Sequence, residues 1–151
     1  MYTRGVCLLG LLFTWGACVA AADPQAIGQI KNVSGEAQVI RGEEVLSASL
    51  GTLVRNGDLV RTGADGAIGI TFADNSRFSI GPGSEVLLEN FEFDSTTHEG
   101  RFQSRLNRGT LTGVSGKLVA QQPESMTVET PTALLGVRGT TFLIRTGASD
   151  D

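Results

Sequence analysis

The chain has 151 residues, with 12 Lys and Arg, 16 Asp and Glu and one His, which gives a formal net charge of −4. This acidic balance argues against a nucleic-acid partner, because neutralising a phosphate backbone requires a basic surface. The length suffices for one modest domain.

The first 22 residues have the pattern of a secretory signal peptide. Arg4 supplies a positive charge, Val6 to Val19 is apolar, and Ala20-Ala21-Ala22 offers the small residues of a cleavage site. The apolar run is short for a membrane span, and no later stretch is long enough. We therefore expect a signal peptide over 1–22 and a periplasmic or secreted domain over 23–151, without a transmembrane segment.

The cysteines suggest a second version of this leader. Trp15-Gly16-Ala17-Cys18 resembles a lipoprotein cleavage box, so a lipid anchor on Cys18 is the alternative to cleavage after Ala22. Because Cys7 and Cys18 both lie in the leader, the mature chain has no disulfide, catalytic thiol or cysteine metal site.

After residue 23, short apolar segments are separated by Gly, Asn, Asp or Pro, which predicts an all-β domain with frequent turns. We expect one small domain with the architecture of a β-solenoid or roll, and a β-sandwich is the alternative. The expected strands are Ala26–Val33, Glu36–Arg41, Thr52–Arg55, Leu59–Thr62, Ala67–Phe72, Arg77–Ile80, Glu85–Phe93, Arg101–Leu106, Thr110–Val114, Lys117–Gln121, Met126–Glu129, Ala133–Val137 and Thr140–Arg145.

Turn residues and alternation refine this expectation. Asn56-Gly57-Asp58 tolerates the positive φ of a tight hairpin. Asp74-Asn75-Ser76 is expected to close an Asx-type turn, with a calcium loop as the alternative. In the last strand, Phe142 and Ile144 point to one side and Leu143 to the other, which favours a central strand buried on both faces.

Residues for catalysis are largely missing. The single histidine, His98, lies in a polar loop over Asp94–Gly100, and no nucleophile-elbow motif accompanies it. One His and scattered carboxylates do not indicate a metal site. We expect no enzymatic activity, no cofactor and no metal, with a hydrolase of unusual site as the least favoured option.

The same loop separates acidic from basic side chains. If its flanking strands form a hairpin, opposite charges face each other across it, and a charged docking strip is the alternative. Because binding residues concentrate in loops, we expect the partner contacts to include Asp94, His98 and Glu99. The acidic residues before the loop are Glu85, Glu89, Glu92 and Asp94, and the basic residues after it are Arg101, Arg105 and Arg108.

Arg138 is a charged residue within the most apolar run of the domain, from Thr130 to Ile144. An always-ionised guanidinium is costly there without partners. Gly136 and Gly139 bracket the site, so we expect Arg138 to fasten the closing strand from a corner, by bonding backbone carbonyls or Asp58. Contact with a ligand or partner is the alternative.

Two stretches combine into a recognisable pattern. The first runs from Gly57-Asp58-Leu59-Val60-Arg61-Thr62-Gly63 through Ile70-Thr71-Phe72-Ala73-Asp74-Asn75-Ser76 to Gly81-Pro82-Gly83-Ser84. The second is Val128-Glu129-Thr130-Pro131-Thr132-Ala133 followed by Val137-Arg138-Gly139-Thr140-Thr141-Phe142. Over about residues 30–146 they resemble the FecR-type domain, named for regulators of ferric-citrate uptake. The matching positions, expected to be structural, are Gly57, Asp58, Thr62, Gly63, Asp74, Ser76, Gly81, Thr130, Pro131, Arg138, Gly139 and Thr140.

The resemblance implies a β-rich domain outside the inner membrane that works through protein contact. The regulators also have a sigma-factor-binding segment, a membrane helix and a C-terminal receptor-binding subdomain. In this sequence we expect a cleavable leader in place of the first two, and no room for the third. We expect a stand-alone envelope module, a scaffold or adaptor that binds another envelope protein. A sensory subunit that modulates a separate membrane signalling protein is the alternative.

Overall fold

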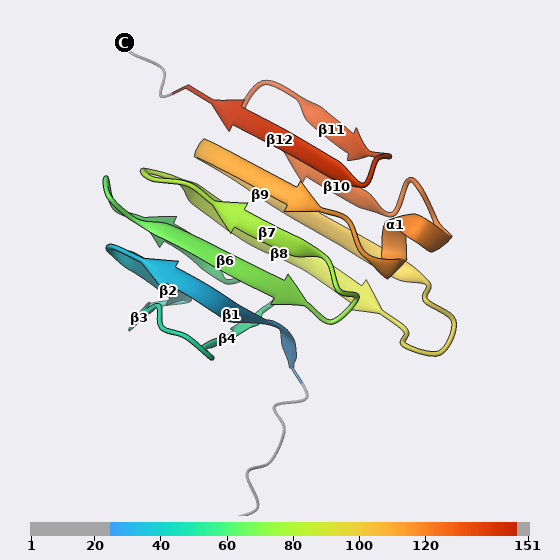
Figure 1. The fold of residues 1–151 in the computed structure, drawn as a ribbon, viewed down its shortest axis with the longest axis horizontal. Helices are drawn as coiled ribbons and strands as arrows, with labels where there is room; N and C mark the ends of the chain where they lie inside the picture. The colour runs from blue at the N-terminus through green and yellow to red at the C-terminus, as the bar shows by residue number, and fades with distance from the viewer. Residues whose placement is uncertain (1–24, 148–151) are drawn as a thin grey trace, which may run out of the picture.

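A computed structural model describes residues 25–147, which form twelve strands and one short helix (Figure 1). The expected all-β class is confirmed, whereas the expected leader and Cys18 lie outside the described residues. No helix within 25–147 has the length and apolar character needed to cross a membrane. The elements are β1 (Ala26–Ser34), β2 (Ala37–Arg41), β3 (Glu44–Ser47), β4 (Leu53–Arg55), β5 (Leu59–Thr62), β6 (Ala67–Phe72), β7 (Arg77–Ile80), β8 (Glu85–Phe93), β9 (Gly100–Val114), α1 (Lys117–Gln121), β10 (Met126–Glu129), β11 (Leu134–Val137) and β12 (Thr141–Thr146).

The strands form one curled sheet in the order β3-β2-β5-β8-β9-β7-β6-β1-β4, whose neighbours are all antiparallel. Its two layers are joined by the long strand β9, which pairs with β8 in its first part and with β7 in its last part. β10 adds to β9 in parallel and carries β11, while β12 pairs with the end of β9. The result is a half-barrel (Figure 1).

The core lies between the two layers and follows the alternation of the strands. Ile68, Ile70 and Phe72 of β6 are buried, while the residues between them are only partly covered. Four phenylalanines meet at the centre, with 4.6 Å between the ring centroids of Phe72 and Phe102. Aromatic pairs of this kind add about 0.5–1.5 kcal/mol beyond the burial of their area.

The expected turn at Asp74 is confirmed as an Asx turn. Ser76 N donates to Asp74 Oδ1 at 3.0 Å, Ser76 Oγ donates to Oδ2 at 2.6 Å, and Asn75 has a φ of 67°. Asp74 is fully buried and also accepts a bond from Leu118 N at 3.4 Å. These donors use both carboxylate oxygens for the fold, and residues 25–147 contain no cluster of metal-ligating side chains.

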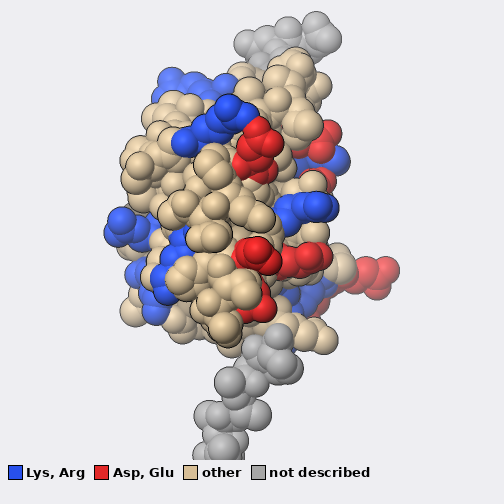
Figure 2. All heavy atoms as spheres, turned by 90° about the vertical axis from the view of Figure 1, so that its right-hand side faces the viewer, with Lys and Arg blue, Asp and Glu red and all other residues tan. Residues whose placement is uncertain are grey.

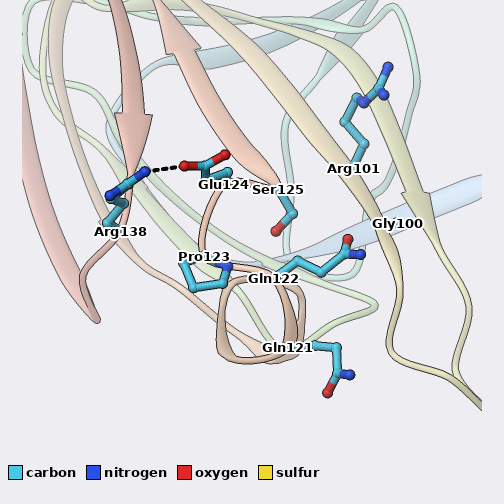
Figure 3. A pocket seen from close by; sticks show the side chains of 8 residues that line it. All are labelled: Gly100, Arg101, Gln121, Gln122, Pro123, Glu124, Ser125 and Arg138. Carbon is cyan, nitrogen blue, oxygen red and sulfur yellow. Dashed lines mark hydrogen bonds and ion pairs between the residues drawn. The ribbon is translucent and has the colours of Figure 1, made fainter.

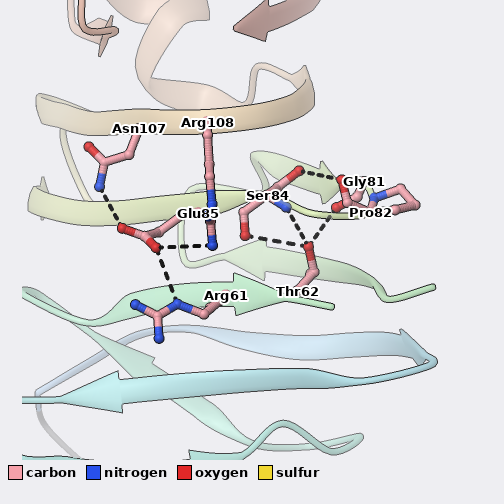
Figure 4. Close-up of polar contacts among 8 residues, drawn as sticks. All are labelled: Arg61, Thr62, Gly81, Pro82, Ser84, Glu85, Asn107 and Arg108. Atoms are coloured by element: carbon pink, nitrogen blue, oxygen red, sulfur yellow. Dashed lines mark hydrogen bonds and ion pairs between the residues drawn. The ribbon is translucent and has the colours of Figure 1, made fainter. Parts of the chain in front are cut away.

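Other residues of the first motif also connect strands. The fully buried Asp58 accepts two bonds from Arg41, at 2.9 Å from Nε and 2.8 Å from Nη2, and one from Arg55 N at 2.8 Å. Thr62 Oγ1 donates to the carbonyl of Gly81 at 2.7 Å and accepts from Ser84 N at 2.9 Å (Figure 4).

One expected strand is wrong, because Lys117–Gln121 forms helix α1. Asp74 accepts hydrogen bonds from two backbone N–H groups at the start of this helix. Its carbonyl accepts from Lys117 N at 2.8 Å, and its carboxylate accepts from Leu118 N. Leu118 and Val119 are both buried. Two successive buried residues suit a helix facing one layer better than a half-exposed strand, whose side chains alternate.

Two further expectations about strands are corrected. The segments Arg101–Leu106 and Thr110–Val114 belong to a single strand, β9, because the turn-like residues between them form an irregular bend within it, with Gly109 at a φ of 92°. Strand β3 was not expected, and it is short and mostly exposed: Val45 is 58% exposed, and Leu46 is the residue of β3 that packs against the core.

The last strand is at an edge and is not central. Among the described residues, β12 pairs only with β9, in an unbroken register from Thr141 opposite Val114 to Thr146 opposite Gly109. Phe142 and Ile144 pack against the core as expected, but Leu143 on the other face is 64% exposed. The expectation of burial on both faces was therefore wrong.

Candidate functional site

Three segments that are distant in sequence gather at one end of the molecule. They are the β8–β9 loop (residues 94–99), the α1–β10 connection (122–125) and the β11–β12 turn (138–140), all at the right of Figure 1. We call this surface the loop end. Figure 2 faces it and shows acidic and basic side chains intermixed over it.

The β8–β9 loop is an ordered turn. The Asp94 carboxylate accepts bonds from the backbone of Thr96 at 2.7 Å and of Thr97 at 3.1 Å, and these bonds hold the pKa of Asp94 below its ordinary value. His98 has a φ of 60°, and its ring stacks on Phe93 with 6.0 Å between centroids. Of the three expected contact residues, Asp94 and His98 thus shape the loop, while Glu99 is exposed.

Next to this loop lies a polar hollow (Figure 3). Arg138 donates to Glu124 across it, and these two side chains are 72% and 75% exposed. Arg101 also borders the hollow, is exposed, and has no side-chain partner within residues 25–147. The hydroxyl of Ser125 at its border is buried and lacks a hydrogen-bond partner among the described residues. The remaining lining residues are Gly100, Gln121, Gln122 and Pro123.

The expected bond between Arg138 and Asp58 is not present. Asp58 is paired with Arg41, while Arg138 bonds the exposed Glu124. Exposed ion pairs contribute about 0–1 kcal/mol, because water already solvates both charges. Arg138 therefore adds little to the stability of the fold, contrary to the expectation that it fastens the closing strand.

The other residues of the second motif form the two turns that flank β11. Thr130 Oγ1 donates to the carbonyl of Ala133 at 3.1 Å and accepts from Ala133 N at 3.0 Å, closing the turn that contains Pro131. At the other end of β11, the carbonyl of Gly139 accepts from Ser115 Oγ and that of Thr140 from Ser115 N, both at 2.8 Å. These contacts set where β11 and β12 begin.

The expected opposite-charge pairs across the β8–β9 hairpin are present. Arg105 lies 2.9 Å from both Glu89 and Glu129, and its hydrogen bond to Glu129 and the charge of Glu89 raise its pKa. Glu85 is 3.2 Å from Arg61 and 3.8 Å from Arg108 (Figure 4). Arg101 is the exception on the basic strand, which leaves its guanidinium available at the loop end.

The loop end presents charged and polar side chains. The guanidiniums of Arg101 and Arg138, the carboxylate of Glu124 and the amides of Gln121 and Gln122 line the hollow. The exposed Glu99 lies in the neighbouring β8–β9 loop. Guanidiniums bind carboxylates through paired donors. The sequence predicted Glu99 as a partner contact and Arg138 as a structural clip. It did not predict Glu124, because only the folded α1–β10 connection brings this residue to Arg138.

Comparison with known proteins adds an independent finding. The model of the family described as FecR protein matches residues 58–151, more than half of the chain, and this range includes the second motif stretch and all of the first except Gly57. Searches of curated proteins and of solved structures found no match. The chain therefore belongs to the FecR family, which generally supplies regulatory or sensor components of signalling that act with other signalling proteins, and whose domains are typically extracytoplasmic.

Proposed function

We propose that this protein is a non-enzymatic binding module of the periplasm or cell envelope, a scaffold or adaptor that docks another envelope protein at the loop end. The observation that carries the proposal is the exposed Arg138–Glu124 pair on the same hollowed surface as Arg101, whose side chain has no partner among the described residues. Membership of a family that acts with other proteins supports it.

The energetics of the pair favour a role in binding. Because both side chains are mostly exposed, water and partner atoms compete for their charges at little cost to the fold. An acidic side chain of a partner is able to replace Glu124 at Arg138, and a second acidic side chain is able to bind Arg101. Charges of this kind govern association rate and partner choice more than raw affinity.

A sensory role is the second candidate. The family supplies regulatory and sensor components of signalling, which favours a membrane signalling protein as the partner. The identity of the bound protein separates the two: a structural envelope protein supports a scaffold, and an inner-membrane signalling protein supports a sensor. The intact mass of the protein purified from cells tests how it is anchored. A mass that fits a chain beginning at a diacylated Cys18 would indicate a lipoprotein, and a mass that fits cleavage after Ala22 would indicate an unanchored protein.

The experiment is capture of partners from envelope extract by the purified protein and by two charge-reversed variants. Arg138→Glu is expected to lose the specific partner, because it places a second carboxylate beside Glu124. Lys31→Glu, a matched reversal at an exposed residue of β1, is expected to retain it. A partner that Arg138→Glu still binds with wild-type affinity would contradict docking at the loop end.

A further inference from the structure

The free edge of β12 differs from the other strand edges of the sheet. The path of paired strands ends at β3, which has four residues and begins at the exposed Glu44, and at β4, which has only three. Among the described residues β11 is a further edge, since it pairs only with β10, and it also has only four residues. Natural edges are protected by shortness, charge or bulges. β12 has six residues, one charged side chain and no irregularity in its pairing with β9. It is therefore the described edge best prepared to accept another strand.

The backbone groups that β12 offers follow from its register. Ser115 N donates to the carbonyl of Thr140 at 2.8 Å, so this opposed pair is a hydrogen-bonded one. Bonded and non-bonded pairs alternate in an antiparallel ladder, so the even-numbered residues of β12 bond β9. The amide and carbonyl groups of Thr141, Leu143 and Arg145 consequently point away from β9 toward the free side.

β12 is also held firmly in place before any pairing. The ring of Phe142 lies over Gly113 of β9, where a Cβ atom would come within 2.1 Å of the ring. The same ring packs edge-to-face on Phe78, with 6.0 Å between centroids. A strand that is already ordered loses little conformational entropy when it gains a neighbour.

We propose that β12 pairs with β12 of a second copy of this chain, antiparallel about a two-fold axis at Leu143. Leu143 then lies opposite Leu143 of the second copy, and Thr141 lies opposite Arg145. On the core side, Phe142 lies opposite Ile144. In this register every outward-pointing group of Thr141, Leu143 and Arg145 has a partner, and no like charges are opposed.

The sequence of the strand selects a second copy as the occupant. A shift of the register by two residues would place Leu143 opposite Arg145 in one direction and opposite Thr141 in the other, and either shift would lose the apolar match. Further apolar side chains lie nearby, since Leu135 and Ile144 are among the residues that line a groove of mixed polarity between β11 and β12, and Leu134 is 70% exposed. Pairing would extend the layer β4-β1-β6-β7-β9-β12 into the same layer of the second copy.

The mass of the purified protein in solution tests this proposal, measured by light scattering over a range of concentrations. We expect a mass of two chains for the wild type and of one chain for Leu143→Arg, because this substitution would place two positive charges opposite each other at the two-fold axis. Leu50→Arg, at a residue 74% exposed outside β12, is expected to remain a dimer. Monomers at all concentrations, assemblies larger than two chains, or an unaltered Leu143→Arg dimer would overturn the proposal.

A cross-link tests the register even if the charged variant folds poorly. Leu143→Cys, in a chain with Cys7 and Cys18 replaced by Ala, is expected to form a disulfide-linked dimer under mild oxidation. Opposed residues of a hydrogen-bonded pair have Cα atoms about 5.5 Å apart, within the range of a disulfide. Absence of the cross-link, or equal cross-linking through Leu50→Cys, would contradict pairing at Leu143.

Discussion

Asp58 and Glu124 each accept a bond from an arginine, but their surroundings differ. Asp58 is fully buried and accepts bonds from two Arg41 donors and from Arg55 N. Glu124 is 75% exposed, and within residues 25–147 it is bound only by Arg138. Breaking a buried pair leaves an uncompensated charge inside the protein, while breaking an exposed pair returns both groups to water. The same chemistry thus stabilises the fold at one position and leaves charge for binding at the other.

We predict that Asp58→Ala destabilises the protein by about 3 kcal/mol, because the Arg41 guanidinium and the Arg55 amide lose their acceptor. Urea unfolding followed by circular dichroism measures the change. Glu124→Ala is the matched control, and its unfolding free energy should equal that of the wild type. Equal losses in the two variants would show that burial does not separate the pairs.

At the scale of the element, strand β9 and helix α1 mark the limits of local sequence patterns. The alternation of apolar and polar residues predicted β5, β6, β7 and β8 with their observed bounds, because each of these strands has one buried face. It divided β9, since Asn107 and Gly109 are typical turn residues that here bend a continuous strand. It missed α1 because the donors of this helix are satisfied by Asp74, which is distant in sequence.

We predict that Gly113→Ala destabilises the protein by about 1–3 kcal/mol, the usual cost of overpacking, because its methyl group would collide with the ring of Phe142. Thermal unfolding measures the shift. Gly136→Ala is the control, since it is also in a strand but has no atom within 4 Å of an added Cβ. Similar melting temperatures for the two variants would rule out close packing of Phe142 on β9.

For the whole molecule, the layers depend on each other because β9 belongs to both. The sequence indicated the all-β class and most strands, but not this sharing, nor the parallel pairing of β10 with β9. Both depend on which distant segments meet, and local periodicity carries no information on that. The loop end was found only in part for the same reason, since it joins three segments through the fold.

We predict that the two layers unfold together. Buried amides of β6 and β7 in one layer and of β8 in the other should exchange hydrogen with the same opening free energy, because opening either layer releases β9. Hydrogen exchange at increasing urea, read by mass spectrometry, measures both values. A difference above about 1 kcal/mol between the layers would show that each opens separately.

The order of strand pairing also has a consequence for how the protein is made. During synthesis from the N-terminus, β1 to β8 have partners among themselves, and β9 then unites them. β12 reaches its place last of the described strands and lies at the opposite flank from β1 (Figure 1). The growing chain thus has a nearly complete sheet before β12 emerges, so its free edge is presented to other molecules only at the end of folding.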